Sequence, residues 1–188
     1  MNEKSTINGI KDESLQIGWA IENITPDGPT SLYGQYYERI SEYVESPLTV
    51  TVCAIESIDE NGVKEQAIMV SMDLLCPLKH LQEKLKNEVR ELIPDFDVRK
   101  LFLNATHTHS APYPDVESDY GKLLLQKLIQ GVVIAWNQRT PAGISSAYGY
   151  AVVGHNRRVQ YADGTTKMYG DTGRTDFIGL EGSADSDD

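Results

Sequence analysis

The feature that most constrains the fold is a pair of apolar segments, SPLTVTVCAIES (residues 46–57) and EQAIMVSMDLL (65–75), separated by a short polar stretch. Both segments are rich in β-branched residues, which favour strands. The stretch between them contains Asn61-Gly62, a pair typical of tight hairpin turns. We therefore predict an antiparallel hairpin here, and the rest of the chain must fold around the sheet to which it belongs.

The spacing of apolar residues predicts the other elements. Leucine and valine recur every three or four residues after Pro77, from Leu78 to Leu92, as on one face of an amphipathic helix. LQIGWAIENITP (15–26) alternates imperfectly and is interpreted as a first strand. Three further elements are predicted: a buried strand over 99–106, a second helix over 119–138 and a strand over 142–153, followed by a tight turn at Asp163-Gly164. The order predicts an α+β fold with one mixed sheet and helices packed on it.

Length and composition favour a single domain. The 188 residues, 40% of them hydrophobic, match the roughly 100 to 200 residues of one domain. We therefore predict one domain over 1–188. Residues 183–188 are acidic and predict either a disordered tail or a truncated end.

The charge of the chain excludes some classes of partner. A formal net charge of −11 disfavours nucleic acid and anionic membranes, which repel such a surface. No apolar run approaches the roughly 18 residues of a membrane span, and the first residues lack the apolar stretch of a signal peptide. We expect a cytoplasmic protein with no integral membrane segment; a secreted or periplasmic protein stays open as an alternative if residue 1 follows a removed signal. Cys53 and Cys76 are expected to be reduced, buried thiols.

Two histidines one residue apart, His107 and His109, follow the predicted strand in LFLNATHTHSAP (101–112). On a strand or its extended continuation, residues i and i+2 project to the same side, so both imidazoles can point to one place with Thr108 turned away. Such a pair can hold a metal ion or a substrate. It can also simply bond to its neighbours at a strand end.

Several segments beyond this pair resemble one enzyme family in the same order. NATHTHSAP is similar to the histidine motif of the neutral/alkaline, non-lysosomal ceramidase family. The segments GWAIENITP, PLTVTVCAIES, MVSMDLL, GHNRRVQYADG and GLEG resemble its N-terminal catalytic domain. The resemblance spans about residues 17 to 182 and implies the N-terminal portion of a larger catalytic domain.

This resemblance implies a zinc-dependent amidohydrolase that cleaves an N-acyl amide, such as N-acylsphingosine, with a metal-activated water. His107 would be a zinc ligand, His109 would lie in the active site, and Arg157 would face the substrate. The family's other zinc ligands, a histidine, a glutamate and a tyrosine, come from chain beyond this region. The fragment alone is therefore expected to be inactive. The alternative is a non-catalytic module that binds a small ligand with the same fold.

Other candidates have simpler interpretations. Arg157 could be a surface charge, His155 a turn residue and His80 a solvated helix residue. Asp73 is either a strand-end turn residue or a partner that orients His107. The residues Tyr36, Tyr37 and Arg39 could line a pocket, or could cap a core. The oligomeric state is left open.

Overall fold

A computed structural model describes residues 15–149, 154 and 156–182. The chain divides into two compact units, residues 1–144 and 145–188, and each is described by itself. The prediction of a single domain over 1–188 stays a prediction. The final segment 183–188 and His155 lie outside the described residues.

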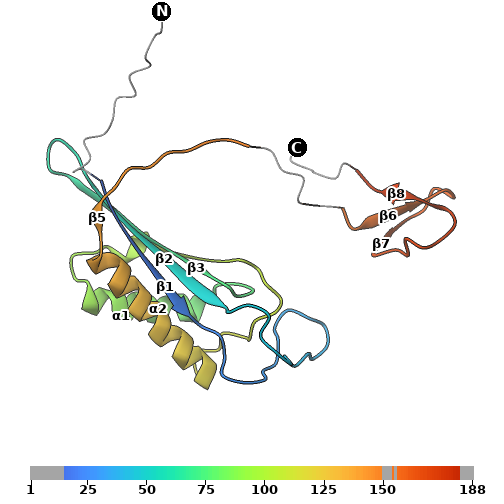
Figure 1. Cartoon of the computed structure of the whole chain (residues 1–188), viewed down its shortest axis with the longest axis horizontal. Helices are drawn as coiled ribbons and strands as arrows, with labels where there is room; N and C mark the ends of the chain where they lie inside the picture. Colours follow the sequence, from blue (N-terminus) through green and yellow to red (C-terminus); the bar gives the residue numbers. More distant parts are fainter. Residues whose placement is uncertain (1–14, 150–153, 155, 183–188) are drawn as a thin grey trace, which may run out of the picture. The chain divides into compact units, whose positions relative to one another are not determined.

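The first unit is built on a five-stranded sheet in the order β4-β3-β2-β1-β5 (Figure 1). β2 (Thr49–Ile58) and β3 (Lys64–Met72) form the predicted antiparallel hairpin. Gly62 has a φ of +79° in its turn, where Asp59 Oδ1 accepts hydrogen bonds from the backbone N–H groups of Asn61 and Val63. These contacts lower the pKa of the Asp59 carboxyl, the bond from Val63 most. The turn sequence therefore fixes the register of the hairpin.

The remaining strands of this sheet flank the hairpin. β1 (Leu15–Asn23) pairs antiparallel with β2, and the two-residue β5 (Thr140–Pro141) pairs with the far side of β1. β4 (Leu101–Ala105), preceded by a 3₁₀ turn at Val98–Lys100, pairs parallel with β3. The sheet is therefore mixed, as predicted.

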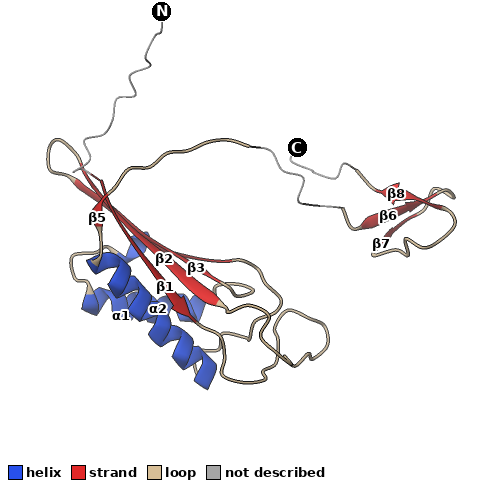
Figure 2. Ribbon diagram, in the orientation of Figure 1, coloured by secondary structure: helices blue, strands red, loops and turns tan. Residues whose placement is uncertain are grey.

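Both helices of the first unit pack on the same face of the sheet (Figure 2). α1 (Lys79–Leu92) buries Leu81, Leu85 and Val89, three of the periodic apolar positions. α2 (Asp119–Asn137) begins at Ser118, whose Oγ accepts a hydrogen bond from the N–H of Gly121. The helices cover alternate residues of each strand, including Val50, Val52, Ile68 and Val70. This layer between sheet and helices is the core.

Strand direction brings three loops to one edge of the sheet. β1, β3 and β4 run the same way, so Asn23, Met72 and Ala105 end together. The N–H of Thr106 donates to the carbonyl of Met72 at 3.0 Å and holds two of these exits side by side. The segments that follow the three strands therefore share one edge, where polar side chains can meet.

The second unit contains a separate three-stranded antiparallel sheet in the order β7-β6-β8, with β6 (Arg158–Tyr161), β7 (Thr166–Met168) and β8 (Phe177–Leu180). Gly164 has a φ of +81° in the predicted turn between β6 and β7. The expectation of one continuous sheet is wrong, because β6 pairs with its own neighbours. The predicted strand 142–153 is also wrong for residues 142–149, which form no strand; 150–153 lie outside the described residues.

The α+β class with a mixed sheet and packed helices is confirmed. No helix in the described part of the chain is long and apolar enough to cross a membrane.

Candidate functional site

His107 and His109 lie in the loop after β4, with ring centroids 5.1 Å apart and ring planes at 82°. The predicted proximity of the two rings is confirmed. The backbone route differs from the prediction, because His107 has a φ of +64° and is not extended. A non-glycine residue in this left-handed region is uncommon and is usually held by surrounding contacts. The rings therefore meet through a local turn of the chain, and not through strand alternation.

Each imidazole is held by a backbone carbonyl from another loop. His107 Nδ1 lies 2.8 Å from the carbonyl oxygen of Leu75, in the loop after β3. His109 Nδ1 lies 2.9 Å from the carbonyl oxygen of Gly34, in the loop after β1. A carbonyl can only accept, so each Nδ1 carries the proton and donates it. In the neutral rings Nε2 is then left with a free lone pair.

A neighbouring amide competes weakly for the same nitrogen of His109. Gln35 Nε2 lies 3.5 Å from His109 Nδ1, at the limit of hydrogen-bond distance. If Gln35 donated, Nδ1 would need a lone pair. The shorter contact with Gly34 favours the tautomer with the proton on Nδ1. This bears on chemistry, since a neutral His109 then accepts a proton at Nε2 and donates from Nε2 only as imidazolium.

Gly34 is where the first loop approaches His109 most closely. It has a φ of +101°, and a Cβ atom on this residue would lie 2.7 Å from His109 Nδ1. Glycine is therefore required both by the backbone conformation and by the imidazole. The sequence prediction did not include Gly34, Gln35 or Leu75, since two of them act through carbonyls that any residue carries.

Arg39 ties the first loop to the backbone of the histidine segment. Its Nη2 donates to the carbonyl oxygen of His109, and its Nε is buried without a hydrogen-bond partner among the described residues. The backbone N–H of Tyr33 donates to the carbonyl of Ala111 at 2.9 Å. The loop after β1 is thus fastened along the histidine segment at two points.

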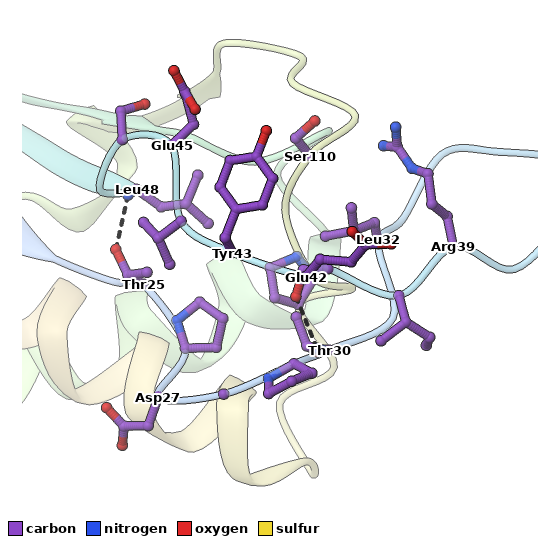
Figure 3. Close-up of a pocket in the computed structure, with 18 of the residues that line it drawn as sticks. Thr25, Asp27, Thr30, Leu32, Arg39, Glu42, Tyr43, Glu45, Leu48 and Ser110 are labelled. Atoms are coloured by element: carbon purple, nitrogen blue, oxygen red, sulfur yellow. Dashed lines mark hydrogen bonds between the residues drawn. The ribbon is translucent and has the colours of Figure 1, made fainter.

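A cavity of about 570 Å³ adjoins this segment (Figure 3). The segment contributes Thr108, Ser110 and Pro112 to its wall, and neither histidine lines it. Thr108 is thus turned to a different surface from the imidazoles, as predicted. The remaining wall comes from the loop after β1: residues 25–30, Leu32, Arg39 and residues 40–46, with Leu48. In Figure 3 the carboxylates of Asp27 and Glu45 point outward from the group of lining residues.

The other sequence candidates take different positions. Asp73 Oδ2 accepts hydrogen bonds from both the N–H and the Oγ1 of Thr49, at 2.9 Å each, so the carboxylate closes the end of the sheet. The hypothesis that Asp73 orients His107 is wrong, because Leu75 supplies that contact. Tyr36 and Tyr37 are exposed and do not line the cavity, whereas Arg39 does. His80 is exposed on α1, as expected.

Arg157 belongs to the second unit. Its Nη1 donates to the Tyr169 hydroxyl at 2.7 Å, and its guanidinium carbon lies 5.7 Å from the centre of that ring. The prediction that it faces the same site as the histidines stays a prediction. The expectation of one sheet is wrong here too, since Arg157 directly precedes β6, which belongs to a different sheet from β4.

The orientation of His107 suits a zinc ligand, but the number of nearby ligands among the described residues is too small for a zinc site. A histidine ligand to zinc commonly donates its other ring N–H to a backbone carbonyl, as Nδ1 of His107 does to Leu75. The ring orientation thus fits a ligand that binds through Nε2. The number of donors falls short: within residues 15–149, 154 and 156–182, no three His, Cys, Asp or Glu side chains are grouped to hold a metal ion.

The fold of this chain was compared with known proteins. The fold is similar to part of solved ceramidase structures. One is the neutral ceramidase from Pseudomonas aeruginosa, with a TM-score of 0.59 and 16% identity over 70% of this chain and 23% of that chain. Another, described as ceramidase complexed with C2, has a TM-score of 0.52 and 17% identity over 68% of this chain and 22% of that one. No family model and no curated protein matches the sequence. The matched region is less than a quarter of each ceramidase chain.

Proposed function

We propose that this chain carries part of the active site of a zinc-dependent amide hydrolase acting on an N-acylated lipid such as N-acylsphingosine. The observation that carries the proposal is the pair of imidazoles in the loop after β4, each with Nδ1 on a backbone carbonyl of another loop. The similarity of the fold to part of neutral ceramidase supports it.

His107 is the proposed zinc ligand. Its Nδ1–H bond to Leu75 fixes the ring and leaves Nε2 to bind the ion. Zinc, when bound, supplies a water whose pKa falls to about 7 and which can attack an amide carbonyl. Further ligands must join His107 to hold the ion tightly, because the described residues provide too few.

His109 is proposed to exchange a proton with the reacting amide. With Nδ1–H on Gly34, its Nε2 accepts a proton in the neutral state and can return it to the leaving nitrogen as imidazolium. Donation of an N–H from His109 Nε2 to a developing oxyanion would require the charged ring. Arg157 is proposed for the oxyanion, since a guanidinium stays charged throughout.

The zinc proposal is tested by calorimetric titration of zinc into the 188-residue chain. We expect binding weaker than about 1 µM, since one or two histidines leave the ion mostly hydrated. His107→Ala should abolish this binding. His80→Ala is the matched control, because it removes an exposed histidine from α1 and should leave the titration unchanged. Equal binding by wild type and His107→Ala would overturn the ligand assignment.

The activity is tested with a fluorogenic N-acylsphingosine on the 188-residue chain and on the complete reading frame that encodes it. We expect no useful turnover by the 188 residues and, if that frame supplies the missing ligands, turnover by its product that His107→Ala abolishes. Turnover by the 188-residue chain would contradict the proposal that it holds only part of the active site.

The second candidate is the non-catalytic ligand-binding module, which the cavity of about 570 Å³ beside Arg39 supports. Cavities of roughly 300 to 1,000 Å³ are typical of small-molecule sites. Inactivity of the complete product on every amide tried, together with ligand-induced stabilisation of the chain, would favour this alternative.

A further inference from the structure

The loop after β1 folds into a narrow hairpin, residues 30–41, beside the histidine segment. The backbone N–H of Leu32 donates to the carbonyl of Arg39 at 2.8 Å, and that of Ser41 donates to the carbonyl of Thr30 at 2.9 Å. Ser41 Oγ accepts a further hydrogen bond from the N–H of Thr30 at 3.0 Å. These bonds close the hairpin and fix the backbone from which the Arg39 side chain projects.

His109 is held at two points by this hairpin. The carbonyl of Gly34, at the tip of the hairpin, accepts the ring Nδ1–H at 2.9 Å. Arg39 Nη2 donates to the backbone carbonyl of His109 itself. One contact fixes the ring and the other fixes the backbone that carries it. Together they determine where Nε2 of His109 points.

His107 is held from a different part of the chain. Its Nδ1 donates to the carbonyl of Leu75, in the loop after β3. The rings of His107 and His109 nevertheless lie close together, with centroids 5.1 Å apart. A change confined to the hairpin should therefore move one ring of the pair and leave the other in place.

We propose that Arg39 is a positioning residue for His109, which rests on the proposed role of His109 in proton exchange. A charged guanidinium gives the carbonyl a stronger hydrogen bond than a neutral donor does. Arg39 Nε is buried without a hydrogen-bond partner among the described residues, which is unfavourable for folding. This unpaired donor argues against a purely stabilising role. The bond to the His109 carbonyl supplies a functional one, in which Arg39 acts through the backbone of the histidine.

The test is the nitrogen NMR spectrum of the four histidine rings in the 188-residue chain, at about pH 8.5, above the ordinary imidazole range. The ring nitrogen shifts report which nitrogen carries the proton, and variants that each replace one histidine by glutamine assign them. In wild type we expect His107 and His109 to carry the proton on Nδ1, because a hydrogen bond at one nitrogen sets the tautomer. Arg39→Met keeps the apolar stem and removes the donors. It should shift the two nitrogens of His109 toward each other, as in a mixture of tautomers, and leave those of His107 unchanged.

Two further variants complete this test. Arg39→Lys restores a cationic donor and should return the His109 nitrogens to their wild-type shifts. Arg90→Met is the matched control, because it removes an exposed arginine from α1 and should change neither ring.

Several results would overturn the proposal. A wild-type His109 with its proton on Nε2 does so without any variant. An Arg39→Met chain in which His109 is unchanged, or in which both rings move together, does so as well. An Arg39→Met chain that fails to fold would show a structural role, and it would count against the proposal too.

A kinetic measurement on the product of the complete reading frame separates positioning from substrate binding. In that product Arg39→Met should lower kcat about tenfold or more and leave KM within about twofold, since a misplaced group slows the chemical step. A raised KM with unchanged kcat would mean that Arg39 binds the substrate, and would overturn the proposal. An inactive product would contradict the proposed function by itself, whereas the NMR spectra still decide whether Arg39 sets the His109 ring.

Discussion

At the scale of single residues, the site depends on backbone groups that sequence patterns do not reveal. The spacing of His107 and His109 predicted two neighbouring rings, and the rings are neighbours. The carbonyls that fix them come from positions 32 and 75 residues away in the chain. Every residue has a carbonyl, so only the fold decides which one lies against an imidazole. Gly34 gave the one local signal, a glycine between bulky residues in the loop after β1.

Gly34→Ala should disturb His109 and lower stability. The new Cβ would lie 2.7 Å from His109 Nδ1 and 3.1 Å from Leu75 Cδ1, on a backbone with φ of +101°. The left-handed conformation alone costs a non-glycine residue about 1 to 2 kcal/mol. We expect a fall of that size in the free energy of unfolding, measured by denaturant titration, and a changed NMR shift for the His109 ring.

Gly143→Ala is the matched control for this substitution. A Cβ on Gly143 would meet nothing within 4 Å, so its effect should be within about 0.5 kcal/mol, as for ordinary surface changes. Equal effects of the two substitutions, with the His109 resonance unmoved, would contradict the close approach of Gly34 to the ring.

At the scale of elements, the sequence predicted the strands and helices whose apolar residues form the core. The hairpin was predicted from its β-branched residues and Asn-Gly turn, β4 from a short apolar run, and the helices from the spacing of their apolar residues. Residues 142–149 were predicted as part of a strand, and their mostly exposed side chains show that no core holds them in a sheet. The separate sheet of the second unit was missed for a related reason. Strand patterns do not say which strands pair.

The turn that leads into β4 is stabilised by the charged carboxylate of Asp97. The free energy of unfolding should therefore depend on pH. Asp97 caps the 3₁₀ turn before β4, and its carboxylate accepts hydrogen bonds from the side chain and backbone N–H of Arg99. The side-chain contact is the largest cause lowering the pKa of Asp97 from 3.8 to about 2. The folded state thus binds the proton less tightly than the unfolded state. The contribution is fully present above about pH 4 and is lost as the pH falls toward 2.

Asp97→Asn should therefore lower the melting temperature slightly at pH 7, and the gap to wild type should narrow as the pH falls from about 4 toward 2. Thermal unfolding by circular dichroism at several pH values measures the gap. Asp95→Asn is the control, because it removes a nearby exposed carboxylate and leaves the Arg99 contact intact. A gap that is constant with pH would show that the charge of Asp97 is not involved.

At the scale of the whole molecule, the chain is two units joined by an exposed segment. Residues 143–149 form no helix or strand, and Tyr148 within them is fully exposed. Proteases cut segments that can extend through their active sites without breaking packed structure. We expect chymotrypsin, at low ratio under native conditions, to cleave after Tyr148 before it cleaves within β1 to β4. Intact-mass spectrometry identifies the products.

Tyr148→Ser should remove the product that ends at Tyr148 and leave the cuts at other positions. The contrary result would be early cleavage within the sheet of the first unit while Tyr148 stays intact. It would mean that this sheet opens more easily than residues 143–149, although its side chains are buried.

The position of β1 has a consequence for how the chain folds during its synthesis. β1 is made before β5 and α2, yet one of its edges pairs with β5, and Glu22 forms an ion pair with Lys127, 105 residues later. The hairpin of β2 and β3 needs only local contacts and can form early, and β1 can add to it. The apolar side of that sheet must then wait for α2 to leave the ribosome, because contacts so distant in sequence close late. During this interval the nascent chain exposes the apolar side of its sheet that α2 later covers, and we expect chaperones that bind emerging chains to recognise it.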